Sequence, residues 1–198
     1  MEDIEILVNK DNLLDEKYIP NNLIETDQNE NNFHKYIDPN LKPMVSNLII
    51  NDFFDLKKQA LYDGFYFVIG SWYRSYKYQK AVWDYNVNKF GLEKTMIKVA
   101  IPGASEHQTG LAIDISVLRN GIFDTNYDLN DDEINWLINN SYKYGFILRY
   151  PKDKENITGI IYEPWHYRYV GKDLAYYLYE NNITLEEYKL QLKNGKSL

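Results

Sequence analysis

Hydrophobic and polar positions along this chain follow helical spacing in some segments and strand spacing in others, and glycines stand at the boundaries. After Pro43, apolar residues recur every three or four positions as far as Leu61, and Gly64 follows. This pattern predicts a helix that turns one face to the core. The short aromatic and β-branched run 65–69, which precedes Gly70, predicts a buried strand.

Later segments carry recognisable helix boundaries. Side chains that can cap a helix occur at Ser75, Asn130 and Thr184, and a glutamate three residues after each of the last two completes a capping-box pattern. We therefore predict helices over about 75–90, 130–144, 172–180 and 184–192, and a shorter one over 93–98. The runs 111–115, 146–150, 159–162 and 165–170 predict strands.

The first 42 residues are less regular than the rest. An apolar patch over 4–8 is followed by a polar tract over 25–32, so we expect a short strand and then a loop that wraps the remaining domain, 43–198. His34 lies in this front segment, and we expect it to be solvated.

Composition narrows the range of functions. A chain of 198 residues, 44% of them hydrophobic, suits one globular domain. The formal net charge of -7 leaves no basic surface for a phosphate backbone, so we expect no nucleic acid partner. The chain has no cysteine, which excludes disulfides, thiolate zinc sites and a cysteine nucleophile. A metal ion would have to be bound by histidine, carboxylate or water.

The chain contains no apolar run that approaches the roughly 20 residues needed to span a bilayer, so we expect no membrane span. Residues 1–5 are acidic, whereas a signal peptide begins with a basic region. If the chain is complete, a cytoplasmic protein is expected. If an N-terminal anchor was removed, the protein would belong to the cell envelope.

Three residues form a candidate metal site. His107, Asp114 and His166 offer two nitrogens and one oxygen, which suits a catalytic zinc ion that keeps a fourth position open for water. His107 and Asp114 are seven residues apart and would lie on opposite faces of one continuous strand. The backbone must therefore bend at Thr109–Gly110 if both are to reach one ion.

Glu163 and Arg74 are candidates for the accompanying chemistry. A carboxylate three residues before His166 can take a proton from a water as it attacks a carbonyl. Pro164 would lose its amide donor inside a helix, so the pair is predicted to lie on a bend and not on the single helix of a zincin. Arg74 follows the predicted strand 65–69 and could face an anion.

Each of these residues has an ordinary alternative when it is considered singly. A lone histidine is usually a surface or hydrogen-bonded residue, and Arg74 could be a surface charge near Asp84 or Glu93. Two of the three histidines, however, lie in dense runs of glycine, tryptophan and acidic residues. The combination favours a hydrolytic zinc site, and a packed turn is the alternative that spacing leaves open.

Three separated stretches of the chain resemble parts of a known enzyme family. Residues 105–114 read Ser-Glu-His-Gln-Thr-Gly-Leu-Ala-Ile-Asp, which resembles the Ser-x-His-x-x-Gly-x-Ala-x-Asp signature of the VanY-type D-alanyl-D-alanine carboxypeptidases. These are zinc enzymes of the LAS metallopeptidase family, which includes the related VanX and VanXY D,D-dipeptidases. Residues 163–171 are similar to the second signature, and 145–151 with 157–159 to the stretch before it. The resemblance covers about 65–192, together with 7–10.

The resemblance implies a role for each candidate in the site. It implies that His107, Asp114 and His166 bind one zinc ion. It further implies that Glu163 is the catalytic base and that Arg74 stabilises the oxyanion of the tetrahedral intermediate.

The same resemblance implies a substrate pocket and a fold. Ser105 matches a residue that holds the terminal carboxylate of the substrate, and Gln79 and Trp165 are assigned to substrate binding. Trp72 stands where relatives often have glycine, which changes the local shape of the pocket. The implied fold is a small α+β domain of the Hedgehog/D,D-peptidase type, with a central antiparallel sheet flanked by helices and the metal in an open cleft.

The implied activity is removal of the C-terminal D-alanine from peptidoglycan stem peptides or their precursors by a monomeric enzyme of cell-wall metabolism, with a possible link to glycopeptide resistance. Two activities with the same zinc chemistry are alternatives: a D,D-dipeptidase and an L,D-carboxypeptidase. A non-catalytic wall-binding module that contains zinc is an alternative of another class. Such a module needs no carboxylate beside the last ligand, so the presence of Glu163 and Arg74 favours the enzyme.

Overall fold

An antiparallel sheet forms the centre of the computed structural model, which describes residues 3–26, 42–119, 122–124 and 128–195. Its strands follow the order β3-β4-β7-β6, with β5 paired to the end of β4, and every pairing is antiparallel. The strands are β3 (Phe67–Ser71), β4 (Ala112–Arg119), β5 (Ile122–Phe123), β6 (Phe146–Leu148) and β7 (His166–Tyr169). The first six residues of β4 are buried, as expected of a central strand.

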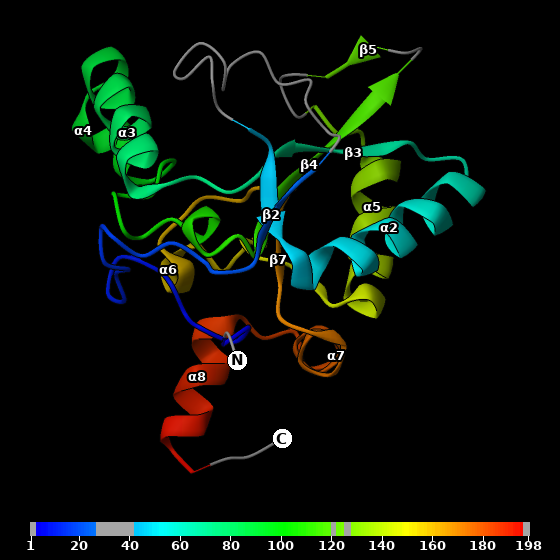
Figure 1. Ribbon diagram of the computed structural model, residues 1–198. Coiled ribbons are helices and arrows are strands. Elements are labelled where there is room, and N and C mark those ends of the chain that lie inside the picture. Colours follow the sequence, from blue (N-terminus) through cyan, green and yellow to red (C-terminus); the bar gives the residue numbers. More distant parts are fainter. Residues whose placement is uncertain (1–2, 27–41, 120–121, 125–127, 196–198) are drawn as a thin grey trace.

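A second, two-stranded sheet pairs β1 (Leu23–Glu25) with β2 (Met44–Ser46). Helices surround both sheets (Figure 1). They are α2 (Asn47–Tyr62), α3 (Tyr76–Phe90), α4 (Leu92–Met96), α5 (Asp131–Asn140), α6 (Glu155–Thr158), α7 (Lys172–Asn181) and α8 (Leu185–Lys193). Two 3-10 turns, η1 (Glu106–Thr109) and η2 (Ser141–Tyr144), complete the described elements.

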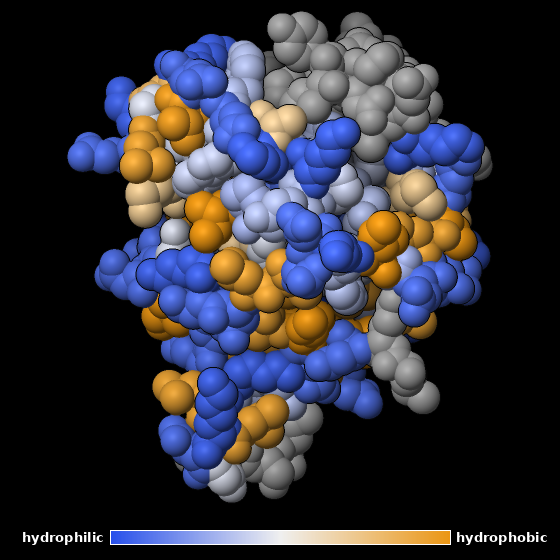
Figure 2. Space-filling model, turned by 60° about the vertical axis from the view of Figure 1, so that its left-hand side comes forward, coloured by the Kyte–Doolittle hydropathy of each residue, from blue (hydrophilic) through white to orange (hydrophobic). Residues whose placement is uncertain are grey.

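Helices lie on different sides of the central sheet (Figure 1). In Figure 1, α2 and α5 are on the right, α3 and α4 are at the upper left, and α8 extends from the bottom. Figure 2 turns the left-hand side forward and shows a face of mostly hydrophilic residues between smaller hydrophobic patches. None of the helices in the described segments is long and apolar enough to cross a bilayer. The expected architecture, a single α+β domain with antiparallel strands and flanking helices, is confirmed.

The predicted caps define several of these helices. Ser75 caps α3, because its hydroxyl accepts a hydrogen bond from the amide of Tyr78. Asn130 and Thr184 each form the predicted capping box with the glutamate three residues on. The first long helix begins later than its apolar pattern suggests, because Ser46 caps it and residues 44–46 pair with β1.

Two predicted strands are wrong. Residues 4–8 are irregular, although Val8 is fully buried, because the guanidinium of Arg168 binds the carbonyls of Ile4 and Ile6 at 3.0 and 2.9 Å in place of a neighbouring strand. Residues 159–162 are irregular as well and follow the short helix α6. His34 and most of the polar tract lie outside the described residues. The division of the chain at residue 42 stays a prediction.

The main core lies between α2 and the sheet. Helical spacing puts Ile49, Phe53 and Leu56 on the inner face of α2, and all three are fully buried. The ring of Phe53 meets the ring of Phe146 on β6 edge to face, with centroids 6.2 Å apart. The neighbouring residue on the helix, Phe54, points outward and is 51% exposed.

We expect Phe53→Ala to lower the free energy of unfolding by about 3–5 kcal/mol, because it removes a buried ring and leaves a cavity. Phe54→Ala is the matched control, with an expected change within about 0.5 kcal/mol. Urea unfolding followed by circular dichroism measures both values. Similar losses in the two variants would contradict the assigned inner face of α2.

Candidate active site

A tight bend brings His107 back toward β4. His107 lies on η1, and this turn ends at Gly110, whose φ of 69° is left-handed. The hydroxyl of Thr109 donates to the carbonyl of Glu106 at 2.6 Å and accepts from the amide of Leu111 at 3.0 Å, which fixes the bend. The bend predicted at Thr109–Gly110 is therefore confirmed.

Gly110 also lies against the two-stranded sheet. A side chain at this position would come within 2.8 Å of the Leu23 side chain and 3.1 Å of the Ser46 backbone nitrogen. The Ser46 amide donates a hydrogen bond to the Gly110 carbonyl at 2.9 Å. Both the left-handed backbone and the close approach of β1 and β2 require glycine here.

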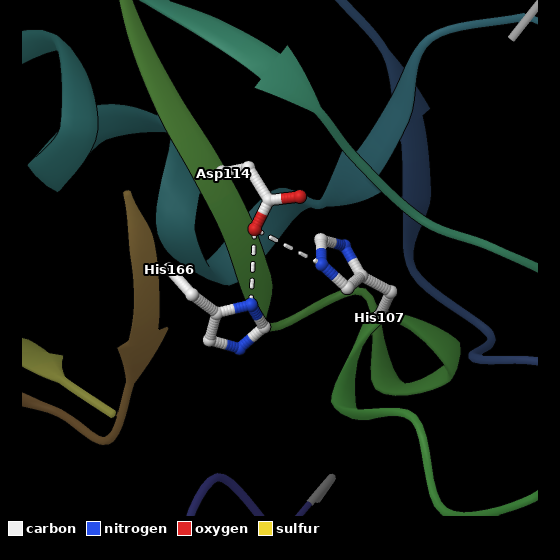
Figure 3. A group of neighbouring side chains, drawn as sticks. All are labelled: His107, Asp114 and His166. Atoms are coloured by element: carbon white, nitrogen blue, oxygen red, sulfur yellow. Dashed lines mark hydrogen bonds and ion pairs between the residues drawn. The ribbon is translucent and has the colours of Figure 1, made fainter. Parts of the chain in front are cut away.

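Strand pairing places Asp114 beside His166. The two residues are partners in the register of β4 and β7, and Asp114 also pairs with Ser71 on β3. Oδ1 of Asp114 lies 3.0 Å from Nδ1 of His166 and 3.3 Å from Nε2 of His107 (Figure 3). One donor atom from each of these three residues lies within 4.8 Å of the others, and all three residues are buried.

Hydrogen bonds hold the two imidazoles so that each turns one nitrogen toward Oδ1 of Asp114. Nδ1 of His107 is 2.8 Å from the carbonyl of Trp72, and its Nε2 is buried without a hydrogen bond among the described residues. His166 has the opposite arrangement: Nε2 is 3.4 Å from a carboxylate oxygen of Glu106, and Nδ1 faces Asp114. Histidine ligands usually engage their second nitrogen in this way, so the donor set fits a metal ion.

The pKa values of the two histidines diverge. Burial and, to a smaller extent, the nearby Arg74 guanidinium lower the pKa of His107 to about 4, so this imidazole is neutral. Burial also disfavours charge on His166, but hydrogen bonds to Asp114 and Glu106 outweigh it and raise the pKa to about 9. The carboxylates around His166 thus favour positive charge at the point where the three donor atoms meet.

Glu106 is the centre of a fully buried charge network. Its Oε1 accepts hydrogen bonds from Arg149 at 2.8 Å and from Arg168 at 2.9 Å. Burial raises the pKa of this carboxyl, but the two guanidinium groups hold it well below its usual value. Arg149 also binds Glu186 on α8 through two hydrogen bonds, at 2.9 and 2.5 Å. The ionised carboxylate therefore fixes the ring of His166.

Sequence analysis did not single out these supporting residues. Glu106 lies inside the first signature, and Arg149 and Arg168 lie in the two other matched segments. Their positions in these segments are the sequence signal that could have identified them. Nothing in the spacing shows that three charges so far apart in the chain meet in one buried cluster.

Glu163 lies next to the donor group on the predicted bend. Its amide donates to the carbonyl of Tyr150, and its own carbonyl accepts from the amide of His166, which closes a turn at Pro164–Trp165. One carboxylate oxygen of Glu163 is 3.9 Å from Nδ1 of His166. Burial raises the pKa of the Glu163 carboxyl to about 7.

Arg74 faces the same group from the other side. One guanidinium nitrogen lies 3.4 Å from Oδ2 of Asp114, and another donates to Gln79 at 3.1 Å. Gln79 in turn donates to the carbonyl of Ala100 at 2.7 Å. This chain of hydrogen bonds holds the guanidinium toward Asp114.

A cavity opens onto these side chains. Its lining contains most of the candidate site residues: Arg74, Gln79, Ser105, His107, Glu163 and His166. Trp165 does not line it, because its side chain packs against the main core instead.

Comparison with known proteins agrees with this geometry. The family described as VanY, D-alanyl-D-alanine carboxypeptidase, matches residues 42–172. The chain belongs to this family. Among relatives of this VanY-family chain, YodJ of Bacillus subtilis (strain 168) is 42% identical over 197 residues, which cover 97% of the chain and 69% of YodJ. A D-alanyl-D-alanine carboxypeptidase of Enterococcus faecalis is 38% identical over 92% of the chain and 64% of its own length.

Solved structures of two relatives share the fold of this VanY-family chain. The vancomycin resistance D,D-pentapeptidase VanY, determined in complex with Zn(II), is 35% identical, with a TM-score of 0.78 over 94% of this chain and 99% of that one. The LdcB LD-carboxypeptidase is 40% identical, also with a TM-score of 0.78, over 93% and 85% of the respective chains.

We expect Glu106→Gln to weaken zinc binding by about 10- to 100-fold, since the variant no longer presents a carboxylate to His166. Competition with a chromophoric chelator measures the affinity, and circular dichroism checks that the variant is folded. Glu93→Gln, at an exposed position on α4, is the control and should bind zinc normally. A folded Glu106→Gln variant with unchanged affinity would show that the carboxylate does not support the site.

Proposed function

We propose that this chain is a zinc-dependent D-alanyl-D-alanine carboxypeptidase that removes the C-terminal D-alanine from peptidoglycan peptides. One observation carries the proposal: the carboxylate of Glu163 and the guanidinium of Arg74 flank the three-residue donor group in one cavity. Membership of the VanY family supports it, and so does a VanYB structure in complex with D-alanine-D-alanine that is 35% identical, with a TM-score of 0.77.

In this proposal, His107, Asp114 and His166 hold one zinc ion. When bound, zinc polarises a carbonyl and lowers the pKa of water. The chain offers the ligand set of a catalytic site, with two imidazole nitrogens and one carboxylate oxygen. We expect the enzyme to act as a monomer, because one chain supplies all these groups.

Glu163 acts as the general base. Its carboxylate takes a proton from the water that attacks the carbonyl carbon of the penultimate residue. The C–N bond then breaks, and Glu163 returns the proton to the amine nitrogen of the departing D-alanine. The 3.9 Å separation between the Glu163 carboxylate and Nδ1 of His166, a proposed zinc ligand, supports this role.

Arg74 and Ser105 orient the peptide. The guanidinium of Arg74 stabilises the negative charge that develops on the carbonyl oxygen, and Gln79 keeps it in position. Ser105 lines the same cavity, and in this proposal its hydroxyl holds the terminal carboxylate. A substrate-binding role for Trp165 stays a prediction.

We expect Glu163→Gln to lower kcat by about 100- to 10,000-fold, because the variant cannot accept the proton. Zinc affinity should stay close to that of the unmodified protein, since Glu163 is not a proposed ligand. Release of D-alanine from a pentapeptide and chelator competition measure the two quantities, with exposed Glu180→Gln as the control. Near-normal turnover in Glu163→Gln would remove this residue as the base.

A second experiment decides the substrate. The unmodified protein loaded with zinc is incubated with a pentapeptide that ends in D-Ala-D-Ala, a tetrapeptide that ends in one D-alanine after an L-residue, and free D-Ala-D-Ala. The proposal expects the highest kcat/KM with the pentapeptide. Preference for the tetrapeptide would indicate the L,D-carboxypeptidase activity named for LdcB, and preference for the free dipeptide a D,D-dipeptidase. If no D-alanine is released from any of the three substrates, the proposed enzymatic activity is contradicted.

A further inference from the structure

A second cavity lies next to the active-site cavity. The first is lined by the proposed catalytic groups, and the second, of about 110 Å³, reaches Asn9 and Lys10 of the N-terminal segment. The two cavities share four lining residues: Val99, Ala100, Tyr150 and Ile160. The two cavities therefore adjoin, and we refer to them together as the cleft; Glu163 lines the first cavity and Lys10 the second.

The backbone that carries Lys10 is held firmly. Val8 is fully buried, and Asn9 forms a closed turn in which its side-chain oxygen accepts hydrogen bonds from the amide of Asp11 at 3.0 Å and the side chain of Asn12 at 2.8 Å. The side-chain amide of Asn9 also donates to Glu186 on α8 at 3.2 Å. Lys10 thus extends from a fixed point on the wall of the cleft.

The Lys10 side chain lies over Gly159, at the end of α6. A side chain built on Gly159 would meet the Cε and Cδ atoms of Lys10 at 3.8 and 3.9 Å. Gly159 and Ile160 both line the same cavity as Lys10. The aliphatic part of the Lys10 side chain therefore lies along the wall of this cavity, and the residue as a whole is exposed.

The charge of Lys10 is not neutralised within the protein. No carboxylate oxygen lies within 4.0 Å of its ammonium in the part of the chain that the structure describes. The carboxylate that Asn9 contacts, Glu186, is engaged by Arg149. The protein carries a net charge of -7, and Lys10 and Lys98 are the lysines among the residues that line the cleft, where either can attract an anion.

We propose that Lys10 binds a carboxylate of the peptide substrate in the second cavity of the cleft. This inference rests on the proposed function, because it assigns the cleft to a peptide that is cut at its C-terminal bond. An ammonium presents three donors in no fixed plane, which suits a carboxylate on a flexible peptide. Of the two carboxylate sources in such a peptide, we assign an acidic residue on the amino-terminal side of the cleaved bond, because the C-terminus lies next to that bond and is assigned to Ser105.

Three peptides that end in D-Ala-D-Ala separate these sources. The first is an acetylated tripeptide whose only carboxylate is its C-terminus. The second is a pentapeptide with a free D-glutamate carboxylate near its amino end, and the third is the same pentapeptide with that carboxylate amidated. KM and kcat are measured for each with the unmodified protein and with Lys10→Gln, Lys10→Glu and Lys10→Arg.

We expect Lys10→Gln to raise KM by about two- to fivefold without a change in kcat, as for an exposed ion pair, and Lys10→Glu to raise it further. Lys10→Arg should restore most of the binding, and added salt should reduce the difference between variants. A rise confined to the pentapeptide with the free D-glutamate supports the upstream carboxylate, whereas an equal rise with all three peptides would contradict this assignment and indicate the C-terminus.

Lys17→Gln and Lys17→Glu are matched controls, since Lys17 is an exposed lysine of the same N-terminal segment that does not line the cleft. Unchanged KM in every Lys10 variant would overturn the inference, as would the same change in the Lys17 variants. The unmodified protein is also tested with all three peptides. Absence of turnover by the unmodified protein would reject the proposed function, and this outcome is distinct from any effect of the Lys10 variants.

Discussion

The site depends on one buried carboxylate. Glu106 accepts hydrogen bonds from two guanidinium groups, and its other oxygen lies near His166. Burial of isolated charges costs several kcal/mol each, so the arrangement is stable only while its members remain paired. Through Arg149 the cluster holds α8, and through Arg168 it holds the carbonyls of Ile4 and Ile6. Segments from both ends of the chain are thereby fastened to a candidate metal ligand.

Asp114 is the second carboxylate that contacts His166, and it faces the opposite ring nitrogen from Glu106. One of its oxygens lies near both imidazoles, and the other lies near Arg74. Burial alone raises its pKa, but His107 and His166 hold it well below the usual value, so Asp114 stays ionised. The donor group and the guanidinium are thus positioned by the same carboxylate, and a change at Asp114 would affect both.

Sequence patterns predicted the local parts of this structure well. Capping residues such as Asn130 and Thr184 identify helix starts because their partners lie three residues away. The odd separation of His107 and Asp114 was enough to predict the bend at Gly110. The patch 4–8 was misassigned because a distant side chain, Arg168, satisfies its carbonyls. The buried network was missed for the same reason, since the pairing of distant charges leaves no periodic signal.

Gly110 illustrates that some positions of the first signature serve the metal site and others serve the fold. The glycine touches no proposed ligand atom; it is required because β1 and β2 pack against a left-handed turn. A descendant of this chain could lose its zinc ligands and still need glycine at position 110 to keep the two sheets together. The glycine of the signature therefore reports the fold, whereas the histidine and the aspartate in it report whether a relative still has a metal site.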